Sequence, residues 1–197
     1  MRKLTAHFYM TLDGRAEFPA YPGSAESQTE ADPAFVEMWI NRYESVDTLL
    51  FGRRAYDDQA NFWPESKRTA SDPKFMHEFS RWKDRVQKVV FSNGLARAAW
   101  QNTRVVKGDI SEFVARLKGE PGKDIILEGG PMLTQQFIQL GLIDDFRMVV
   151  FPVILGGGKN WFGSLLKQQT LKLLSSRSLK DGELVLHYEA VPARADP

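Results

Sequence analysis

Two adjacent glycines near the middle of the chain are the residues best suited to binding a phosphate group. Gly129 and Gly130 follow an aliphatic run at residues 125–127, and Pro131 stands where a helix would have its first residue. A strand that turns through glycines into a helix directs backbone N–H groups and the positive end of the helix dipole to one point. The pattern therefore indicates a phosphate-binding turn, although the same residues also make an ordinary tight turn.

Three other turns stand at similar positions along the chain. Each follows a short apolar run, at Gly52, at Ser92 and at Gly156-Gly157. Ligands of parallel α/β sheets collect beyond the carboxyl ends of the strands, so we expect the four turns to converge on one cleft. Lys159 follows the last glycines, but the spacing and the hydroxyl residue of a P-loop are missing, which excludes that motif.

The composition favours one globular domain that binds a small molecule. A chain of 197 residues, 43% of them hydrophobic, suits a single domain, which we expect over residues 1–190 with a tail at 191–197. The 26 basic and 25 acidic residues nearly balance, so the charge pattern of a nucleic-acid-binding protein is absent.

Cysteine and histidine usage argues against metal and thiol chemistry. The chain has no cysteine, which excludes disulfides, thiolate metal sites and a cysteine nucleophile. Its three histidines lie far apart, so no metal is expected. No signal-peptide core and no apolar run of membrane-spanning length occur, which predicts a cytoplasmic protein without a membrane partner.

The first strand and the first helix flank a polar segment. Alternating residues predict a strand over residues 4–10, ended by Asp13-Gly14. Residues 15–31 are rich in Gly, Pro, Ser and Glu, and a loop of this length is usually either disordered or a lid over a site. Asp32-Pro33 then predicts the start of a helix. The apolar face of that helix is formed by Phe35, Met38, Trp39 and Val46.

The rest of the chain alternates strand and helix patterns. Strands are expected at residues 48–52, 88–92, 103–106, 125–127 and 146–154. Helices are expected after Gly52, after Asp72-Pro73, from Asp109 to Gly119 and from Pro131 to Gly141. Residues 170–179 and 183–190, joined by an Asp-Gly turn, predict a hairpin. These elements describe an α/β fold: a mixed, mostly parallel sheet flanked by helices on both faces, with a C-terminal antiparallel hairpin.

Four short motifs occur in a characteristic order along nearly the whole chain. They are Thr11-Leu12-Asp13-Gly14, Gly52-Arg53-Arg54-Ala55-Tyr56, Glu128-Gly129-Gly130 with Leu133, and Leu142-Ile143-Asp144-Asp145 followed by residues 152–158 and Phe162. Together they resemble the motifs of the dihydrofolate reductase-like family. The closest resemblance is to its branch containing the reductase domain of riboflavin biosynthesis, the 5-amino-6-(5-phosphoribosylamino)uracil reductase.

The resemblance implies that the protein binds NADPH and transfers its hydride. Gly52, Arg53 and Arg54 would lie beside the cofactor phosphates, and Ser92 and Asn93 beside the adenosine 2′-phosphate. The pyrophosphate would face the turn and helix start formed by Gly129, Gly130, Pro131, Met132 and Leu133. The nicotinamide would be flanked by Thr11, Asp13, Leu155 and Gly156.

The chain also departs from the family pattern. Ala55 stands where the family has a threonine whose hydroxyl helps to hold phosphate. The apolar face of the expected first helix lacks the carboxylate with which dihydrofolate reductases proper supply a proton, so folate reduction is not expected. The riboflavin enzyme is often fused to a zinc deaminase domain that needs cysteine ligands, so this chain would correspond to the reductase half alone.

Each of these assignments has a plainer alternative. Arg53 could be an ordinary exposed helix residue and Ser92 a turn former. Glu128 would be repelled by phosphate unless it points away, and it is left out of the expected site. The substrate wall could be formed by three aromatic residues that could equally belong to the core: Phe35, Trp39 and Trp63.

Two functions remain open from the sequence. One is an NADPH-dependent reductase of a small carbonyl, imine or pterin/aminopyrimidine-like substrate. The other is a non-catalytic dinucleotide-binding or interaction domain, which the missing proton donor favours. In either case the terminal hairpin is expected to pair subunits in a homodimer, by analogy with the family.

Overall fold

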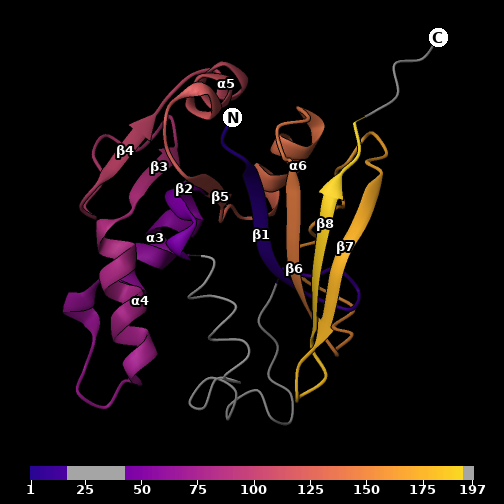
Figure 1. The fold of residues 1–197 in the computed structure, drawn as a ribbon, viewed down its shortest axis with the longest axis horizontal. Helices are drawn as coiled ribbons and strands as arrows, with labels where there is room; N and C mark the ends of the chain where they lie inside the picture. The colour runs from indigo at the N-terminus through magenta and orange to yellow at the C-terminus, as the bar shows by residue number, and fades with distance from the viewer. Residues whose placement is uncertain (17–42, 193–197) are drawn as a thin grey trace.

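The protein is built on one sheet of eight strands within the part described by the structure, a computed structural model covering residues 1–16 and 43–192. The strands are β1 (Leu4–Thr11), β2 (Val46–Gly52), β3 (Gln87–Phe91), β4 (Thr103–Val106), β5 (Asp124–Leu127), β6 (Asp145–Phe151), β7 (Leu171–Ser178) and β8 (Leu184–Ala190). Their order across the sheet is β4-β3-β2-β5-β1-β6-β8-β7, with β4 at one edge and the β7–β8 hairpin at the other (Figure 1).

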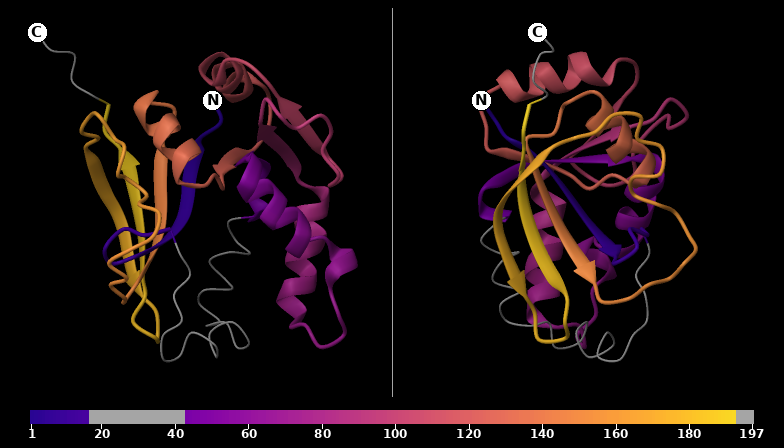
Figure 2. Two further views of the ribbon diagram at one scale, coloured as in Figure 1. Left: turned by 180° about the vertical axis from the view of Figure 1, so that it is seen from behind. Right: turned by 90° about the vertical axis from the view of Figure 1, so that its right-hand side faces the viewer.

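The strand directions confirm the predicted fold class. All pairings from β4 to β6 are parallel, whereas β8 runs antiparallel to β6 and β7 antiparallel to β8. The twist of the sheet and the hairpin at its edge can be followed from two further sides in Figure 2. β6 is buried along almost its whole length because it lies between β1 and β8 and is covered on both faces.

Helices cover both faces of the parallel part of the sheet. They are α3 (Arg53–Phe62), α4 (Lys74–Arg85), α5 (Ile110–Gly119) and α6 (Pro131–Gln139), with a short 3₁₀ helix at Glu65–Lys67. Ile125 of β5 packs in one core cluster with Phe113 of α5 and Phe137 of α6. Ile126, which points to the other face, packs in a second cluster with Tyr56 of α3. The two clusters hold the helices, and therefore their N-termini, in fixed positions against the sheet.

Two helix ends follow the local signals in the sequence. The Asp109 carboxylate caps α5 by accepting a hydrogen bond from the backbone N–H of Glu112 at 2.9 Å. Gly141, which follows α6, has a φ of +64°, a conformation that glycine adopts without strain. Gly182 in the β7–β8 turn has a φ of +93° for the same reason.

Two details of the predicted first half are wrong, and one part lies outside the described residues. Val46 was expected on the apolar face of the first helix, but it begins β2, where it is paired with Asp124 of β5 and buried by the sheet. Asp72 does not cap α4, because its carboxylate accepts a hydrogen bond from the N–H of Thr69; Pro73 is the N-cap. The helix expected from Asp32-Pro33, and with it Phe35 and Trp39, lies in the segment that is not described.

Lys88 is a buried lysine whose charge is held by the end of a helix. Its side chain is 1% exposed, and its ammonium donates hydrogen bonds to the carbonyl oxygens of Lys83 at 2.5 Å and Val86 at 2.9 Å, at the C-terminus of α4. Carbonyl groups at this end carry the negative pole of the helix dipole. Burial lowers the pKa of Lys88 to about 8, although Asp84 opposes the shift.

Candidate functional site

The predicted turns all lie along one edge of the sheet. The strands β3, β2, β5, β1 and β6 are consecutive and parallel, so their carboxyl ends share that edge. Four spacings of about 4.8 Å give a length of roughly 19 Å from β3 to β6. The fold thereby brings together the four turns that the sequence predicted to converge.

Two helix N-termini meet in the middle of this edge. Gly52 is the N-cap of α3, and Gly130 is the N-cap of α6 with Pro131 at its first position. They are neighbours because β2 pairs with β5. The first N–H groups of both helices have no partner within their own helix, so this region can accept an anion.

The two glycines of the β5–α6 turn have different surroundings. A Cβ atom on Gly129 would lie 3.2 Å from Leu127 Cδ1 and 3.2 Å from Leu133 Cδ2, so any side chain at this position would require these leucines to move. A Cβ atom on Gly130 would meet no described atom within 4 Å, so this side of the turn faces open space. Met132 on the first turn of α6 is 88% exposed.

Exposed arginines stand at the start of α3. The Arg53 guanidinium lies along the helix, with Nε 2.5 Å from the Asp57 carboxylate one turn later. Exposed pairs of this kind contribute little stability, so the guanidinium can turn toward an anion at small cost. Arg54, also exposed, follows directly.

Ser92 and Asn93 extend the same edge beyond β3. The Ser92 hydroxyl oxygen accepts a hydrogen bond from the N–H of Leu95 at 3.2 Å, so Ser92 does form the local turn. Its hydroxyl proton is not used by that bond. Asn93 is exposed at the tip of the turn.

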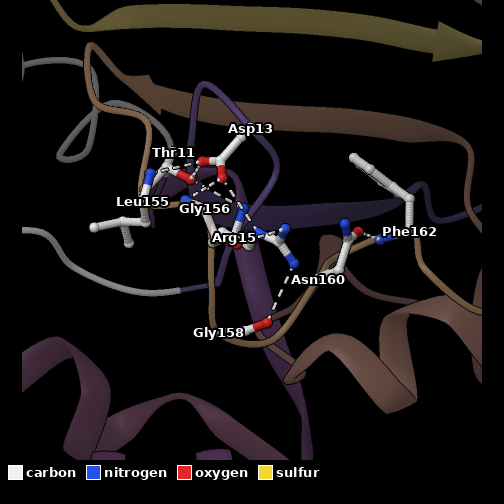
Figure 3. A network of polar contacts seen from close by, with 8 residues as sticks. All are labelled: Thr11, Asp13, Arg15, Leu155, Gly156, Gly158, Asn160 and Phe162. Atoms are coloured by element: carbon white, nitrogen blue, oxygen red, sulfur yellow. Dashed lines mark hydrogen bonds and ion pairs between the residues drawn. The ribbon is translucent and has the colours of Figure 1, made fainter.

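At the other end of the edge, Asp13 joins the loop after β1 to the glycine-rich loop after β6 (Figure 3). Its carboxylate accepts hydrogen bonds from the Thr11 hydroxyl at 2.6 Å and from the backbone N–H groups of Leu155 at 3.2 Å and Gly156 at 2.8 Å. Arg15 adds a fourth donor, Nε at 3.3 Å. Its guanidinium also reaches the carbonyl oxygen of Gly158.

These contacts determine the charge state of Asp13. The hydrogen bond from Thr11 is the largest influence and lowers the pKa of the Asp13 carboxyl well below its usual range; the N–H groups of Gly156 and Leu155 and the Arg15 side chain act in the same direction against the effect of burial. Four donors occupy the four lone-pair sites of a carboxylate. Asp13 is therefore an ionised structural acceptor and not a proton donor.

Sequence reasoning missed an ion pair beneath the β5–α6 turn. Lys83 of α4 is 1% exposed and its Nζ lies 2.7 Å from the Glu128 carboxylate, so the Glu128 side chain is held on the α4 side of the sheet. Lys83 follows Phe79 by four residues and thus lies on the apolar stripe of α4. A lysine on an apolar stripe is a signal that the sequence offers for a buried charge. The sequence does not show that the partner of this lysine is Glu128.

Trp63 is the one residue of the expected substrate wall that the structure describes. It is half-buried at the end of α3 and packs edge-on against Phe79 at 4.5 Å between ring centroids. It also packs against the core cluster on the α3 face. These contacts are those expected if Trp63 belongs to the core and not to a substrate wall. They lie on the sheet face that also carries Glu128.

Two classes of site are absent from the described chain. Residues 1–16 and 43–192 contain no group of three or more His, Asp and Glu side chains that could hold a metal ion. No helix in these two ranges has the length and apolar character needed to cross a membrane.

Comparisons with known proteins agree with the geometry. Residues 2–185 match the RibD C-terminal domain family. The uncharacterized protein YyaP of Bacillus subtilis is 34% identical over 146 residues, which is 73% of this chain and 74% of YyaP.

Solved structures show the same fold. A putative riboflavin biosynthesis protein from Shewanella sp. PV-4 superposes with a TM-score of 0.72 over 96% of this chain and 99% of that chain, at 21% identity. A dihydrofolate reductase from Enterococcus faecalis, complexed with NADP(H), superposes with a TM-score of 0.59 over 95% and 96% of the two chains, at 10% identity. The dihydrofolate reductase-like fold expected from the four motifs is thus confirmed.

Proposed function

This chain belongs to the RibD C-terminal domain family, and we propose that it is an NADPH-dependent reductase that transfers a hydride to a small carbonyl, imine or pterin/aminopyrimidine-like substrate. The family consists of reductase-like domains that generally bind NADP(H). The observation that carries the proposal is the meeting of two helix N-termini, at Gly52 and Gly130, on the edge that also holds the Asp13 loop contact.

The shape of this edge favours a dinucleotide over a single nucleotide. Its phosphate-binding groups, at the starts of α3 and α6, lie between the Ser92 turn on β3 and the glycine-rich loop after β6. A ligand with a central pyrophosphate and a nucleoside at either end has its groups in the same order as these binding groups. Ser92 and Asn93 then lie on the adenosine side, and Thr11, Asp13, Leu155 and Gly156 on the nicotinamide side.

The protein's own contribution to the reaction is mainly positional. NADPH, when bound, supplies the hydride, so the chain has to hold cofactor and substrate together and exclude water. The N–H groups of α3 and α6 and the guanidinium of Arg53 hold the phosphates. Asp13 keeps the Leu155-Gly156 turn in place. Because Asp13 stays ionised, the proton that accompanies the hydride comes from another group or from water.

Cofactor binding is tested by titration. We expect NADPH to bind with one site per chain, to raise the melting temperature and to bind more tightly than NADH; a ligand at 100 times its Kd adds about 2.7 kcal/mol of stability. Fluorescence titration gives the number of sites and the affinities for NADPH and NADH, and thermal unfolding gives the shift in melting temperature. No response to NADPH in either measurement would reject the proposal.

A matched pair of arginine variants locates the phosphates. Arg53→Ala is expected to raise the Kd for NADPH by ~10-fold, the effect of losing about 1.4 kcal/mol of binding free energy. Arg81→Ala is the control, because Arg81 is also exposed and paired with a carboxylate, that of Glu65, but lies on α4. Equal effects of the two substitutions would show that Arg53 acts only through general charge.

Binding without turnover is the second candidate function. It is favoured by the saturation of Asp13 with four donors, which removes this carboxylate as an acid. Oxidation of NADPH with any member of a panel of aminopyrimidine, pterin and ketone substrates would exclude it. Binding of NADPH without oxidation across the panel would instead favour it over the reductase.

The terminal hairpin is the proposed homodimer surface. β7 is exposed along most of its length at the sheet edge, and Leu173, Leu174 and Leu184 are between 42% and 51% exposed. Exposed apolar residues on an edge strand favour pairing with another chain. Light scattering at micromolar concentration should give twice the 22.4 kDa of one chain, and the double substitution Leu173→Glu/Leu174→Glu should give the single mass. A monomeric wild-type protein would contradict this.

A further inference from the structure

Lys83 and Glu128 form a buried ion pair directly below the β5–α6 turn. The Lys83 ammonium donates hydrogen bonds to Glu128 Oε2 at 2.7 Å and to Gln59 Oε1 at 2.5 Å. The Lys83 side chain is 2% exposed and the Glu128 side chain 11%. The ammonium also lies 5.0 Å from the ring centroid of Phe79 and 5.5 Å from that of Trp63, where the ring faces attract a cation.

The position of Glu128 makes its charge a problem for anion binding. It is the residue immediately before Gly129, at the end of the strand that leads into α6. An uncompensated carboxylate there would oppose the positive potential of the helix N-terminus. Lys83 neutralises the Glu128 carboxylate and holds it on the α4 side of the sheet. A phosphate at the turn would then meet the partial positive charges of the backbone N–H groups.

The same ammonium connects the two helices that meet at the phosphate end. Gln59 belongs to α3, which begins at Gly52, and Glu128 precedes α6, which begins after Gly130. Lys83 comes from a third element, α4, so one ammonium contacts both the C-terminal half of α3 and the residue before the Gly129-Gly130 turn. Burial lowers the pKa of Lys83, and the Glu128 charge opposes this.

We propose that Lys83 is a positioning residue of the dinucleotide site, which compensates the Glu128 carboxylate and holds it on the α4 side of the sheet. This inference rests on the proposed function, because it assigns the purpose of the ion pair to phosphate binding. It adds a residue that would touch neither cofactor nor substrate and that acts through Glu128.

Four variants separate charge compensation from simple packing. Lys83→Met removes the ammonium but keeps a long apolar side chain, and leaves Glu128 unpaired. Lys83→Met/Glu128→Gln removes both charges, and Glu128→Gln removes only the carboxylate. The control is Lys88→Met, because Lys88 is equally buried at 1% exposure, but its ammonium donates to the carbonyl oxygens of Lys83 and Val86 and lies over the Trp100 ring.

The expected result is a charge-specific loss of cofactor affinity. Lys83→Met should raise the Kd for NADPH at least ~10-fold, whereas the double variant should return to within ~3-fold of wild type. Glu128→Gln and Lys88→Met should stay within ~3-fold. In steady state, Lys83→Met should raise KM for NADPH more than it lowers kcat. Thermal unfolding is followed for every variant, so that a loss of stability is seen separately.

The outcomes that overturn the inference are distinct from those that reject the function. If the wild-type protein binds NADPH and Lys83→Met binds it with the same Kd, the role of Lys83 is overturned while the proposed function stands. The same conclusion follows if the double variant has as high a Kd as Lys83→Met. A ~10-fold loss of NADPH affinity in Glu128→Gln would show that the Glu128 carboxylate itself serves the site, and would also overturn the inference. If Lys83→Met does not fold, the double variant decides, since it buries no unpaired charge. A wild-type protein that binds no NADPH rejects both proposals.

Discussion

Replacing Gly130 with alanine is expected to raise the Kd for NADPH at least ~10-fold while leaving the protein folded and nearly as stable as wild type. Gly130 has a φ of −71° and a ψ of 173°, which alanine adopts without strain. The added Cβ would meet no described atom within 4 Å. The cost to stability should not exceed about 1 kcal/mol, the difference between glycine and alanine as an N-cap. The methyl group would instead occupy the space through which a phosphate approaches the turn.

Gly129→Ala is expected to have the opposite profile. Its Cβ would lie 3.2 Å from atoms of Leu127 and Leu133, so the core has to shift and the unfolding free energy should fall by about 1–3 kcal/mol. The two adjacent glycines therefore separate packing from ligand approach. Denaturant unfolding and NADPH titration of both variants measure the two effects.

Gly119→Ala provides the matched control for the first prediction. Gly119 is the last residue of α5, and an added Cβ there would also meet no described atom within 4 Å. We expect no change in NADPH affinity and a small gain in stability, because alanine favours the helix. If Gly130→Ala binds NADPH as tightly as Gly119→Ala does, no phosphate lies against Gly130.

Asp13→Asn is expected to lower kcat/KM by ~100-fold, about 2.7 kcal/mol of transition-state stabilisation. The asparagine side chain replaces one carboxylate oxygen by an NH₂ group, which would face a hydrogen-bond donor on either side. The N–H group of Leu155 or that of Gly156, depending on which oxygen is replaced, then loses its acceptor, and the turn beside the expected nicotinamide position moves. Single-turnover measurement of NADPH oxidation should show the loss in the hydride-transfer step, with a smaller change in the Kd for NADPH.

Thr11→Val is the milder comparison for Asp13→Asn. It removes the hydroxyl donor to Asp13 but leaves both backbone contacts of the carboxylate intact. We expect a fall in kcat/KM of ~10-fold or less. A larger effect of Thr11→Val than of Asp13→Asn would contradict the role assigned to the carboxylate.

The lowered pKa of Asp13 adds a pH signature to the second prediction. A carboxyl group whose pKa is lower in the folded than in the unfolded state stabilises the fold above its unfolded value, near 3.9. This contribution is lost as the pH falls below that value toward the lower folded pKa. The stability difference between wild type and Asp13→Asn should therefore be constant from pH 5 to 8 and shrink in acid, as acid-unfolding curves would show.

Local signals in the sequence were sufficient for the elements that begin and end with them. Gly130-Pro131 is the start of α6 because proline suits the first position of a helix, and Asp109 caps α5 through a contact three residues away. Val46 shows the limit of such reasoning. Its apolar character predicted a buried position correctly, but only the pairing of β2 with β5 makes that position part of a strand.

The candidate site divides along the same line. The sequence by itself determined the α/β class, the glycine turns at the ends of parallel strands and the order of the four motifs, because these depend on conformational preferences within a few residues. Only the tertiary structure decided that two of the four donors to Asp13 are N–H groups more than 140 residues away, and that Lys83 neutralises Glu128. Such contacts depend on strand order and helix packing, which bring distant residues together without leaving a periodic pattern in the chain.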